Sequence, residues 1–333
     1  MKKLLILGTG AYASALANNF YENFDVVNLY GIDEFEINDI NENKMNSKYF
    51  PDIKFLSEDL FATNDIEIAL KDATHILISL PTGVIKNVIE KKILPHLKTK
   101  VYWINASKGF IPGYSLENDF LLSIIPNEVS NGIYKIIGGT FAIEMMRNMP
   151  SFLTLTSDQE ICNEDLLKRF NSQKVFTTWN DDYVAINLFS IFKNIYAIAQ
   201  GMLEGLGYEK NTQTFFMMKS LKELTGIYEE LTNKKLLSST LITSALLGDF
   251  ILTGTSKTSR NFTFGYSLIS KSVEEAFVQN KTIEGAISLK ELLLSYPKII
   301  EKHSLLNILN KVIYKNKNPI DEFNKVLIND KNH

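Results

Sequence analysis

The amino-acid sequence predicts an α/β protein in which a doubly wound, mostly parallel sheet is followed by an all-α domain. The chain has 333 residues, which is more than one typical domain holds. In residues 1–180, short apolar runs alternate with amphipathic stretches, a pattern typical of βαβ units. In residues 181–333, long apolar-rich patterns with helical spacing replace the short runs. We therefore expect two domains, 1–180 and 181–333.

Seven short runs rich in Ile, Leu, Val or aromatic residues have the length and composition of buried strands. These runs are residues 3–7, 26–30, 75–80, 101–105, 134–137, 152–156 and 175–178. Helical patterns such as 82–94 and 164–171 lie between them. The second half contains helical patterns alone, at residues 184–206, 212–231, 238–247, 272–280, 282–295 and 303–314.

Composition and charge argue against several classes of function. The formal net charge of -3 gives no electrostatic basis for nucleic-acid binding. The single cysteine, Cys162, can form no disulfide within the chain, and the histidines show no zinc-ligand spacing. No stretch is long and apolar enough to span a membrane. We expect a cytoplasmic protein without a metal, a nucleic-acid partner or membrane insertion; the oligomeric state stays open, with a homodimer as one option.

A glycine-rich turn follows the first predicted strand, where Gly8, Gly10 and Ala13 form the pattern G-x-G-x-x-A. Gly8 permits a tight turn, Gly10 lets the backbone approach a pyrophosphate, and Ala13 is small enough for the next helix to pack on the strand. Because the motif follows a strand and precedes a helical pattern, it predicts a Rossmann-type dinucleotide site. The alternative is an ordinary strand-to-helix turn.

Asp33 lies just beyond the second predicted strand, where a carboxylate can accept a hydrogen bond from the adenosine 2′-hydroxyl. No lysine or arginine stands between Tyr30 and Asp33 to bind a 2′-phosphate. This favours NAD(H) and leaves NADP(H) as the second option, which a lysine from elsewhere, such as Lys44 or Lys48, would strengthen. Capping of the next helix explains Asp33 equally well.

The densest polar cluster lies at residues 248–261 and ends in Ser259, Arg260 and Asn261. A guanidinium, a hydroxyl and an amide can together bind the three oxygens of a phosphate monoester. Only three arginines occur in the chain, so the presence of Arg260 within a polar motif makes it a candidate phosphate ligand. A solvated loop rich in Ser and Thr is the alternative.

Two lysines are candidates for chemistry. Lys193 lies inside an apolar helical pattern, where a charge is costly unless it is paired or functional, and where burial lowers its pKa toward the range of a proton-transfer group. Lys108 follows the predicted strand 101–105, at the carboxyl edge of a parallel sheet, where ligands bind. For either lysine alone, a surface side chain is the simpler explanation.

Together these features resemble the bacterial-type NAD(P)-dependent glycerol-3-phosphate dehydrogenases along nearly the whole chain. The segments that carry the resemblance are residues 8–17, 46–51, 79–82, 107–109, 138–144, 193–194, 201–211, 248–265 and 283–285. The sequence departs from the family pattern at Ala13, Gly139 and Gly254, where the family has Gly, Pro and Cys. It also has Ile32 where a basic residue is common.

The resemblance implies reversible reduction of dihydroxyacetone phosphate to sn-glycerol 3-phosphate by NAD(P)H, which supplies phospholipid synthesis. It implies that Lys193 is the proton donor and acceptor, and that Asp249 orients either Lys193 or a substrate hydroxyl. The implied contacts with the small phosphate substrate are Lys108, Gly138, Thr140, Asp249, Ser259, Arg260 and Asn261. Besides Gly8, Gly10 and Asp33, the expected cofactor contacts are Ala11, Tyr12, Lys108, Ala142, Arg260 and Glu284.

Two rival functions belong to other classes. Dehydrogenases of the β-hydroxyacid or 6-phosphogluconate type share this layout and a lysine on the first long helix, but the cluster at Ser259, Arg260 and Asn261 separates them from this chain. A non-catalytic nucleotide-binding sensor would have no need of Lys193 and Lys108.

Overall fold

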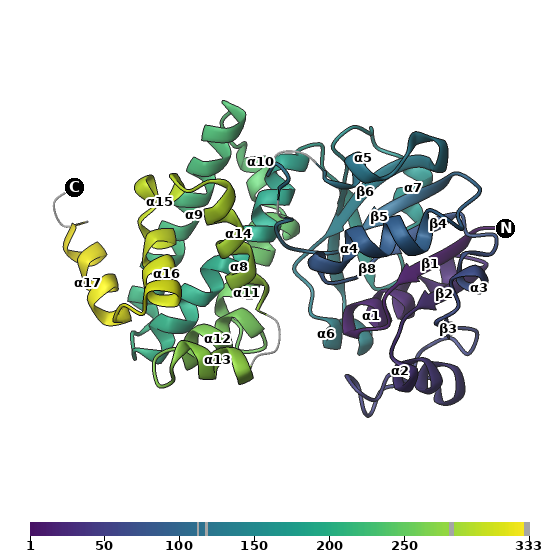
Figure 1. Ribbon diagram of the computed structural model, residues 1–333, viewed down its shortest axis with the longest axis horizontal. Helices are drawn as coiled ribbons and strands as arrows, with labels where there is room; N and C mark the ends of the chain where they lie inside the picture. The colour runs from purple at the N-terminus through teal and green to yellow at the C-terminus, as the bar shows by residue number, and fades with distance from the viewer. Residues whose placement is uncertain (112, 117–118, 280–282, 330–333) are drawn as a thin grey trace. The chain divides into compact units, whose positions relative to one another are not determined.

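The computed structural model describes residues 1–111, 113–116, 119–279 and 283–329 (Figure 1). The chain forms two compact units, Met1–Ser107 with Asn118–Tyr183, and Lys108–Glu117 with Val184–His333. The division after Tyr183 lies three residues beyond the expected boundary at residue 180. The structure also groups the segment Lys108–Glu117 with the second unit, although the sequence alone places it in the first.

An eight-stranded sheet forms the framework of the first unit, in the order β3-β2-β1-β4-β5-β6-β7-β8. The strands are β1 (Lys3–Leu7), β2 (Val26–Tyr30), β3 (Phe61–Thr63), β4 (His75–Ile78), β5 (Val101–Asn105), β6 (Ser130–Ile137), β7 (Ser151–Thr156) and β8 (Val175–Trp179). Every neighbouring pair is parallel except β6 and β7. This confirms the predicted Rossmann-type sheet.

The order of the strands reverses in the middle of the sheet. The chain begins at β1, continues outward to β2 and β3, and then crosses to β4 on the other side of β1. In open parallel sheets, ligands bind at such a reversal, beyond the carboxyl ends of the strands. The expected dinucleotide site should therefore lie beyond Leu7 and Ile78, the last residues of β1 and β4.

Seven strands correspond to the seven predicted runs, and β3 was missed. Its three residues, Phe61, Ala62 and Thr63, are too few to show alternation, and the Phe61 side chain is exposed. The strand pairs with β2 through Asn28, Leu29 and Tyr30. The sheet therefore has one more strand on the β2 side than the hydrophobic pattern indicates.

Short helices connect the strands. They are α1 (Ala11–Phe20), α2 (Glu34–Asn38), α3 (Ile66–Leu70), α4 (Thr82–Val88), α5 (Leu121–Ile124), α6 (Ala142–Met146) and α7 (Glu164–Arg169). Two of them continue as π-helical turns, α2 through Asp39–Asn43 and α4 through Ile89–Ile93. The predicted helix 82–94 is therefore helical over most of its length but changes its hydrogen-bond pattern part-way.

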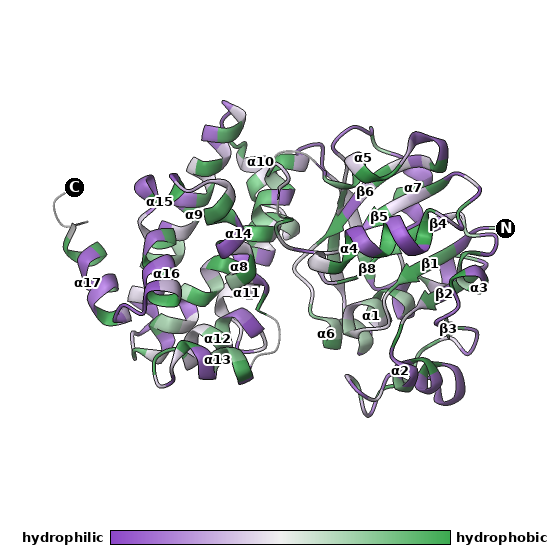
Figure 2. Ribbon diagram, in the orientation of Figure 1, coloured by the Kyte–Doolittle hydropathy of each residue, from purple (hydrophilic) through white to green (hydrophobic). Residues whose placement is uncertain are grey.

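The core of the first unit surrounds β1, all five of whose residues are buried. A central parallel strand is covered on both faces, which explains its continuous apolar run. The rings of Phe20 and Phe24 each contact Phe170 edge-on, at centroid distances of 5.1 and 5.9 Å. Figure 2 shows hydrophobic and hydrophilic residues interspersed along α4, as expected for a helix with one buried face.

The second unit consists of helices in its described residues, as predicted. They are α8 (Tyr183–Gly205), α9 (Lys210–Thr232), α10 (Ser238–Leu241), α11 (Asp249–Thr255), α12 (Arg260–Ser267), α13 (Val273–Gln279), α14 (Glu284–Ser295), α15 (Ile299–Lys302), α16 (Ser304–Lys315) and α17 (Pro319–Asn329). The predicted helix 238–247 is split, because α10 ends at Leu241 and a π-helical turn follows at Ser244–Gly248.

Helix α8 is the centre of the second unit, and residues 185–203 are all buried. Its neighbours approach closely through glycine. A Cβ atom at Gly265 of α12 would lie 2.0 Å from the carbonyl oxygen of Ile198. A Cβ atom at Gly285 of α14 would lie 2.3 Å from the carbonyl oxygen of Asn194. Both helices therefore contact the backbone of α8, the helix that carries Lys193.

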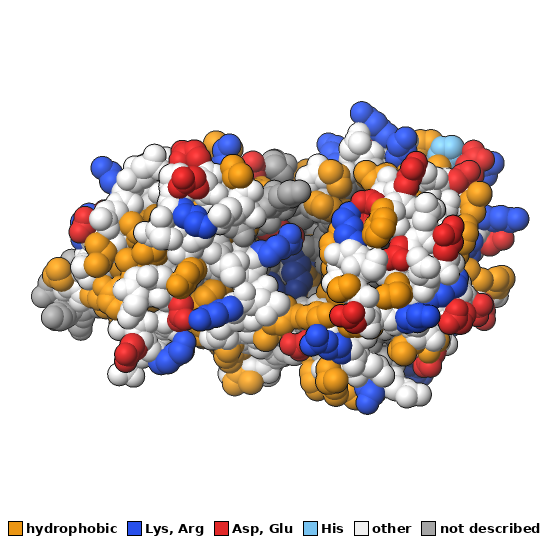
Figure 3. Space-filling view, turned by 90° about the horizontal axis from the view of Figure 1, so that it is seen from below, with side chains coloured by type: hydrophobic (Ala, Val, Ile, Leu, Met, Phe, Trp, Pro, Cys, Tyr) orange, Lys and Arg blue, Asp and Glu red, His pale blue; other side chains and the backbone are white. Residues whose placement is uncertain are grey.

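The surface carries charges of both signs. On the face in Figure 3, lysine and arginine side chains alternate with acidic ones, in keeping with a net charge of -3. Among the described residues, no helix combines the length and the apolar character needed to cross a bilayer.

Candidate active site

A cluster of buried charges surrounds Lys193 in the middle of α8. The Lys193 ammonium forms an ion pair with Asp249 and donates a hydrogen bond of 3.2 Å to the hydroxyl of Thr253. Thr253 in turn donates to the other oxygen of Asp249, at 3.2 Å. Lys193 is 4% exposed and Asp249 is 2% exposed. Of the two roles open to Asp249, the structure thus shows the contact with Lys193.

Lys108 belongs to the same cluster. Its ammonium lies 3.3 Å from Asp249 Oδ2, the oxygen that also binds Lys193, and its side chain is 16% exposed. One carboxylate therefore holds two ammonium groups, and when both lysines are protonated the three side chains together carry one positive charge. Such a cluster is suited to binding an anion or stabilising a developing negative charge.

The surroundings of Lys193 change its acidity. Burial lowers the pKa of Lys193, the Asp249 carboxylate opposes that shift, and the Lys108 ammonium adds to it. A lysine with a lowered pKa can exchange its proton near neutral pH, as a general acid or base must. The geometry therefore supports Lys193 as a proton-transfer group.

Two further predicted residues lie where α12 and α14 meet α8. The amide of Asn194 donates to Glu284, at 3.4 Å. The backbone N–H of Gly285 donates to the side-chain oxygen of Asn261, at 2.9 Å. That bond leaves the Nδ2 group of Asn261 without a hydrogen bond to any described residue. The bond between Glu284 and Asn194 thus connects the first turn of α14 to α8, next to Lys193.

The predicted trio Ser259, Arg260 and Asn261 lies at the start of α12, but its members differ in exposure. Ser259 is the N-cap of α12, where its hydroxyl oxygen accepts from the N–H of Phe262 at 3.4 Å. Ser259 and Asn261 are buried, whereas Arg260 is exposed. No described residue forms a hydrogen bond or ion pair with its guanidinium. The alternative prediction, that these residues lie in a solvated loop, is therefore wrong for Ser259 and Asn261, which are buried at the start of α12.

The glycine-rich turn lies beyond β1 at the reversal of strand order. Gly8 has a φ of +119°, and a Cβ atom there would lie 2.6 Å from the carbonyl oxygen of Ser79, beyond β4. Gly10 is the N-cap of α1, with Ala11 the first residue of the helix; no side chain caps it, and a Cβ atom at Gly10 would meet nothing within 4 Å. Open space therefore borders the backbone where a pyrophosphate would bind. This geometry fits a dinucleotide.

Other predicted residues of the first unit have local contacts. The hydroxyls of Tyr12 and Thr140 are 3.2 Å apart, which joins α1 to the segment before α6. Ala142 is the first residue of α6 and packs on the core. A Cβ atom at Gly138 would lie 2.1 Å from the carbonyl oxygen of Phe152. Close packing of β6 against β7 is therefore sufficient reason for a glycine at 138.

Asp33 lies in an ion cluster with Lys48, one of the two lysines that the sequence offered as a cation from elsewhere in the chain. Its carboxylate caps α2 by accepting from the N–H of Glu36 at 3.1 Å, which is the alternative that the sequence left open. Lys48 lies 2.5 Å from Asp33 and 2.6 Å from Glu36. No basic side chain stands beside residue 33 in the local sequence, but the fold brings Lys48 to Asp33, which is the alternative that the sequence had left open.

Glu36 and Thr253 were not among the predicted site residues. Thr253 stands four residues after Asp249, which places both on one face of a helix, and this spacing could have indicated it. Glu36 offers no such signal, because its partners Thr9 and Lys48 are distant in sequence. Among the described residues, no group of three or more His, Cys, Asp or Glu side chains could hold a metal ion.

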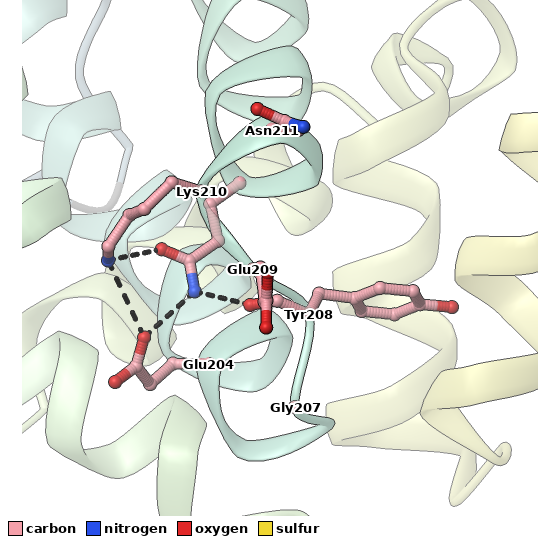
Figure 4. Close-up of a pocket in the computed structure, with 7 residues that line it drawn as sticks. Glu204, Gly207, Tyr208, Glu209, Lys210 and Asn211 are labelled. Atoms are coloured by element: carbon pink, nitrogen blue, oxygen red, sulfur yellow. Dashed lines mark hydrogen bonds and ion pairs between the residues drawn. The ribbon is translucent and has the colours of Figure 1, made fainter.

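A polar pocket of about 430 Å³ lies at the start of α9 (Figure 4). Its lining residues are Glu204, Gly207, Tyr208, Glu209, Lys210, Asn211 and Gln213. The side chain of Gln213 accepts from Lys210 at 2.7 Å and donates to Glu204 at 2.8 Å and to the carbonyl of Tyr208 at 2.6 Å. These polar groups bind one another, and none of the predicted site residues lines the pocket.

Comparison with known proteins bears on both units. Residues 3–162 match the family model described as NAD-dependent glycerol-3-phosphate dehydrogenase N-terminus, and residues 182–324 match its C-terminus counterpart. The chain belongs to the NAD-dependent glycerol-3-phosphate dehydrogenase family. It is therefore an oxidoreductase of this family, and neither rival function is needed to explain its sequence.

Individual relatives agree with this assignment. A protein of Staphylococcus saprophyticus named glycerol-3-phosphate dehydrogenase [NAD(P)+] is 31% identical over 331 residues, which cover 98% of each chain. A protein of the same name from Mycoplasma mobile is 32% identical over 335 residues, covering 98% of this chain and 96% of the relative. The crystal structure of glycerol-3-phosphate dehydrogenase from Coxiella burnetii superimposes with a TM-score of 0.86 at 26% identity, covering 98% of both chains.

Proposed function

We propose that this chain catalyses the reversible reduction of dihydroxyacetone phosphate to sn-glycerol 3-phosphate with NADH or NADPH. The observation that carries the proposal is the buried pair of Lys193 and Asp249 on α8 and α11, joined by Lys108, in a member of this family. A bound nicotinamide would supply or accept the hydride. The side chains of this protein then have to bind the substrate and move one proton.

Lys193 is the proposed proton donor in the direction of reduction and the acceptor in the direction of oxidation. Negative charge develops on the ketone oxygen as the carbonyl is reduced, and an ammonium beside that oxygen stabilises the charge and supplies the proton. Asp249 and Thr253 fix the position of Lys193 Nζ, and the lowered pKa makes release of the proton easier. Lys108 adds a second positive charge to the same place.

Arg260 is the proposed anchor of the substrate phosphate, together with Asn261 and the hydroxyl of Ser259. Its guanidinium is exposed at the first residue of α12, so it is available to a ligand. Asn261 retains its amide nitrogen as a donor. The amino end of a helix also favours an anion electrostatically. Binding energy from this non-reacting phosphate would hold the carbonyl carbon in place for the reaction.

The dinucleotide is proposed to bind along Gly8, Gly10, Ala11 and Tyr12, and the family resemblance adds Glu284 and Arg260 as proposed contacts. We also propose that the enzyme supplies glycerol phosphate for phospholipid synthesis. We propose further that it works in the cytoplasm and that it forms a homodimer. The single cysteine is consistent with a reducing compartment. Light scattering of the purified protein would test the homodimer.

Absorbance at 340 nm tests the activity directly. We expect rapid oxidation of NADH or NADPH with dihydroxyacetone phosphate, and slow oxidation with unphosphorylated dihydroxyacetone or with β-keto acids. The reverse reaction with glycerol 3-phosphate should produce the reduced cofactor, whereas 6-phosphogluconate should not. A preference for a β-keto acid over dihydroxyacetone phosphate would contradict the proposal and favour the first rival function.

A further inference from the structure

Five side chains form one hydrogen-bonded cluster beyond the ends of β1 and β2. Glu36 is its centre and accepts from three donors: the hydroxyl of Thr9 at 2.5 Å, the ammonium of Lys48 at 2.6 Å and the hydroxyl of Tyr49 at 3.0 Å. The same ammonium lies 2.5 Å from Asp33. Thr9 stands between the two glycines of the turn, so the cluster joins the turn to the segment after β2.

The members of the cluster differ in exposure, and this separates their roles. The side chain of Glu36 is 5% exposed, whereas those of Asp33 and Lys48 are 37% and 42% exposed. Asp33 and Lys48 are therefore accessible to a ligand. The buried Glu36 fixes their positions, because its carboxylate binds the Lys48 ammonium and its backbone N–H donates to Asp33. The Lys48 ammonium lowers the pKa of Asp33, which keeps that carboxylate ionised.

In a Rossmann-type site, a carboxylate at the end of the second strand accepts from the adenosine 2′-hydroxyl of NAD, whereas a cation there pairs with the 2′-phosphate of NADP. Here Asp33 and Lys48 occupy that place together. Two carboxylates share the one ammonium, so the cluster carries one negative charge. The charge of Lys48 is already neutralised by one carboxylate, and the charge of the second carboxylate would repel a 2′-phosphate.

We propose that Asp33, Glu36 and Lys48 determine which cofactor this enzyme prefers, with Lys48 acting as a phosphate ligand that the two carboxylates hold inactive. The inference rests on the proposed function, since it requires the dinucleotide to bind along the turn of Gly8 and Gly10. Asp33 selects NADH by accepting from the 2′-hydroxyl. Removal of its charge leaves Lys48 paired with Glu36 instead of with two carboxylates, so that the ammonium can also bind the 2′-phosphate.

The proposal predicts opposite changes in NADPH binding for two substitutions. Asp33→Asn removes one of the two charges that hold Lys48, so it should weaken NADH binding and strengthen NADPH binding. The ratio of the two dissociation constants should shift by about tenfold or more, the factor that corresponds to about 1.4 kcal/mol. Lys48→Met should leave NADH binding within about twofold and weaken NADPH binding further.

The double variant Asp33→Asn/Lys48→Met is the decisive experiment. If Lys48 is the phosphate ligand, the gain in NADPH binding that follows Asp33→Asn must disappear in the double variant. If the gain persists, Asp33 acts by repulsion alone and the proposal is wrong. Glu34→Gln is the matched control, because it removes one exposed carboxylate from the first turn of α2. It should shift the ratio by less than twofold.

Binding is measured by the fluorescence of NADH and NADPH titrated with each variant in the absence of substrate, so the result does not depend on turnover. Adenosine 2′,5′-bisphosphate and adenosine 5′-monophosphate, which differ only in the 2′-phosphate, serve as competitors. Binding of neither cofactor to the wild type would overturn the proposed function together with this inference. Unchanged selectivity in folded Asp33→Asn and Asp33→Ser would overturn the inference alone. Circular dichroism verifies that each variant is folded.

Discussion

Asp249 holds two ammonium groups with one carboxylate oxygen, and the side chains of Asp249 and Lys193 are almost fully buried. An ion pair that is almost fully buried is costly to form, and removal of one partner leaves the other charge uncompensated. A protein gains little stability from such an arrangement compared with well-packed apolar side chains. The cluster is therefore better explained by the chemistry of Lys193 than by stability of the fold.

Lys193→Met should lower kcat by about 100-fold to 10,000-fold, the usual contribution of a positioned proton-transfer group. Methionine retains most of the side-chain volume, so α8 should remain packed. The dissociation constant for NADH should stay near the wild-type value, because the glycine-rich turn belongs to the first unit. Steady-state kinetics and fluorescence titration measure the two quantities. Lys222→Met, on the exposed side of α9, is the control, and near wild-type turnover in Lys193→Met would refute the assignment.

The pH dependence of turnover should report the lowered pKa of Lys193. Reduction requires the ammonium form, so kcat for reduction should fall as pH rises through that pKa. Oxidation requires the neutral amine, so kcat for oxidation should rise over the same interval. The midpoint should lie below 10.5, the value for an ordinary lysine, because burial disfavours the charged form. If the residual activity of Lys193→Met no longer changes with pH in this interval, the assignment to Lys193 is supported. If the change persists, another group causes it.

Arg260→Ala should lower kcat/KM for dihydroxyacetone phosphate by about 10-fold to 150-fold, since a charge-assisted hydrogen bond contributes about 1.5–3 kcal/mol. Activity with dihydroxyacetone, which has no phosphate, should change much less. Lys257→Ala removes a positive charge from the same turn, where Lys257 pairs with Glu204 at 3.0 Å, and is the control for general electrostatics. Equal losses with both substrates would show that Arg260 does not bind the phosphate.

At the scale of elements, the regular strands and long helices were predictable because burial imposes a period on the sequence. Strands β1, β2 and β5 have the predicted bounds, and α8 differs from its pattern by one residue at each end. Short elements carry too few residues for a period, which is why β3 was missed. The segment around residues 256–259 was difficult for another reason: serine and threonine hydroxyls favour caps and loops alike.

The candidate site was predictable to the extent that each residue stands in a recognisable local pattern. Lys193 in an apolar helix and Asp249 in a polar cluster are visible in the sequence, and the structure brings them together. The contact of Lys48 with Asp33 depends on the path of the chain between β2 and β3, which no periodicity specifies. The sequence could name Lys48 only as one of two candidate lysines, and the fold was needed to show that Lys48 reaches Asp33.

Helix α11 contains a glycine where the family pattern has a cysteine, and a small void lies beside it. The void is too narrow for a water molecule and borders both Lys193 and Gly254. A Cβ atom at Gly254 would lie 3.0 Å from Met217 Cε, the mobile end of a flexible side chain. A methyl group at this position should therefore find space after a small shift of Met217.

Gly254→Ala should stabilise the second unit by about 0.5–1 kcal/mol, because alanine favours a helix by about that amount over glycine. Gly265→Ala, in the adjacent α12, should instead destabilise it by about 1–3 kcal/mol, since its methyl group would meet the backbone of α8. Urea denaturation of both variants measures the difference. Destabilisation by Gly254→Ala as large as that of Gly265→Ala would show that Met217 cannot move.

At the scale of the whole molecule, each unit assembles its site from segments that are distant in sequence. The second unit brings together Lys108, Lys193 and Asp249, and the first joins Thr9, Glu36 and Lys48. Sites built in this way are lost when either unit unfolds. The stability of the first unit at low pH therefore bears directly on function.

His75 of β4 should make the first unit acid-labile. Its ring lies between Phe24 and Tyr102, at centroid distances of 5.1 and 5.2 Å, and its Nε2 atom has no hydrogen-bond partner among the described residues. Burial lowers the pKa of His75 to about 4 from 6.5, with a smaller contribution from the positive charge of Arg169. Below pH 6.5 the unfolded chain then binds a proton that the folded chain does not.

Stability should consequently fall as pH decreases from about 6.5 to about 4, by about 1.4 kcal/mol per pH unit and about 3 kcal/mol in all, with no further loss from this group below pH 4. His75→Phe keeps an aromatic ring in the same place, and Thr74 retains its hydrogen bonds to the backbone of Lys3 at 2.9 and 3.0 Å. The variant should therefore have a flatter dependence of melting temperature on pH, while His96→Phe, at an exposed histidine, serves as the control. An unchanged acid limb in His75→Phe would mean that other groups, such as the buried His303, cause the loss of stability.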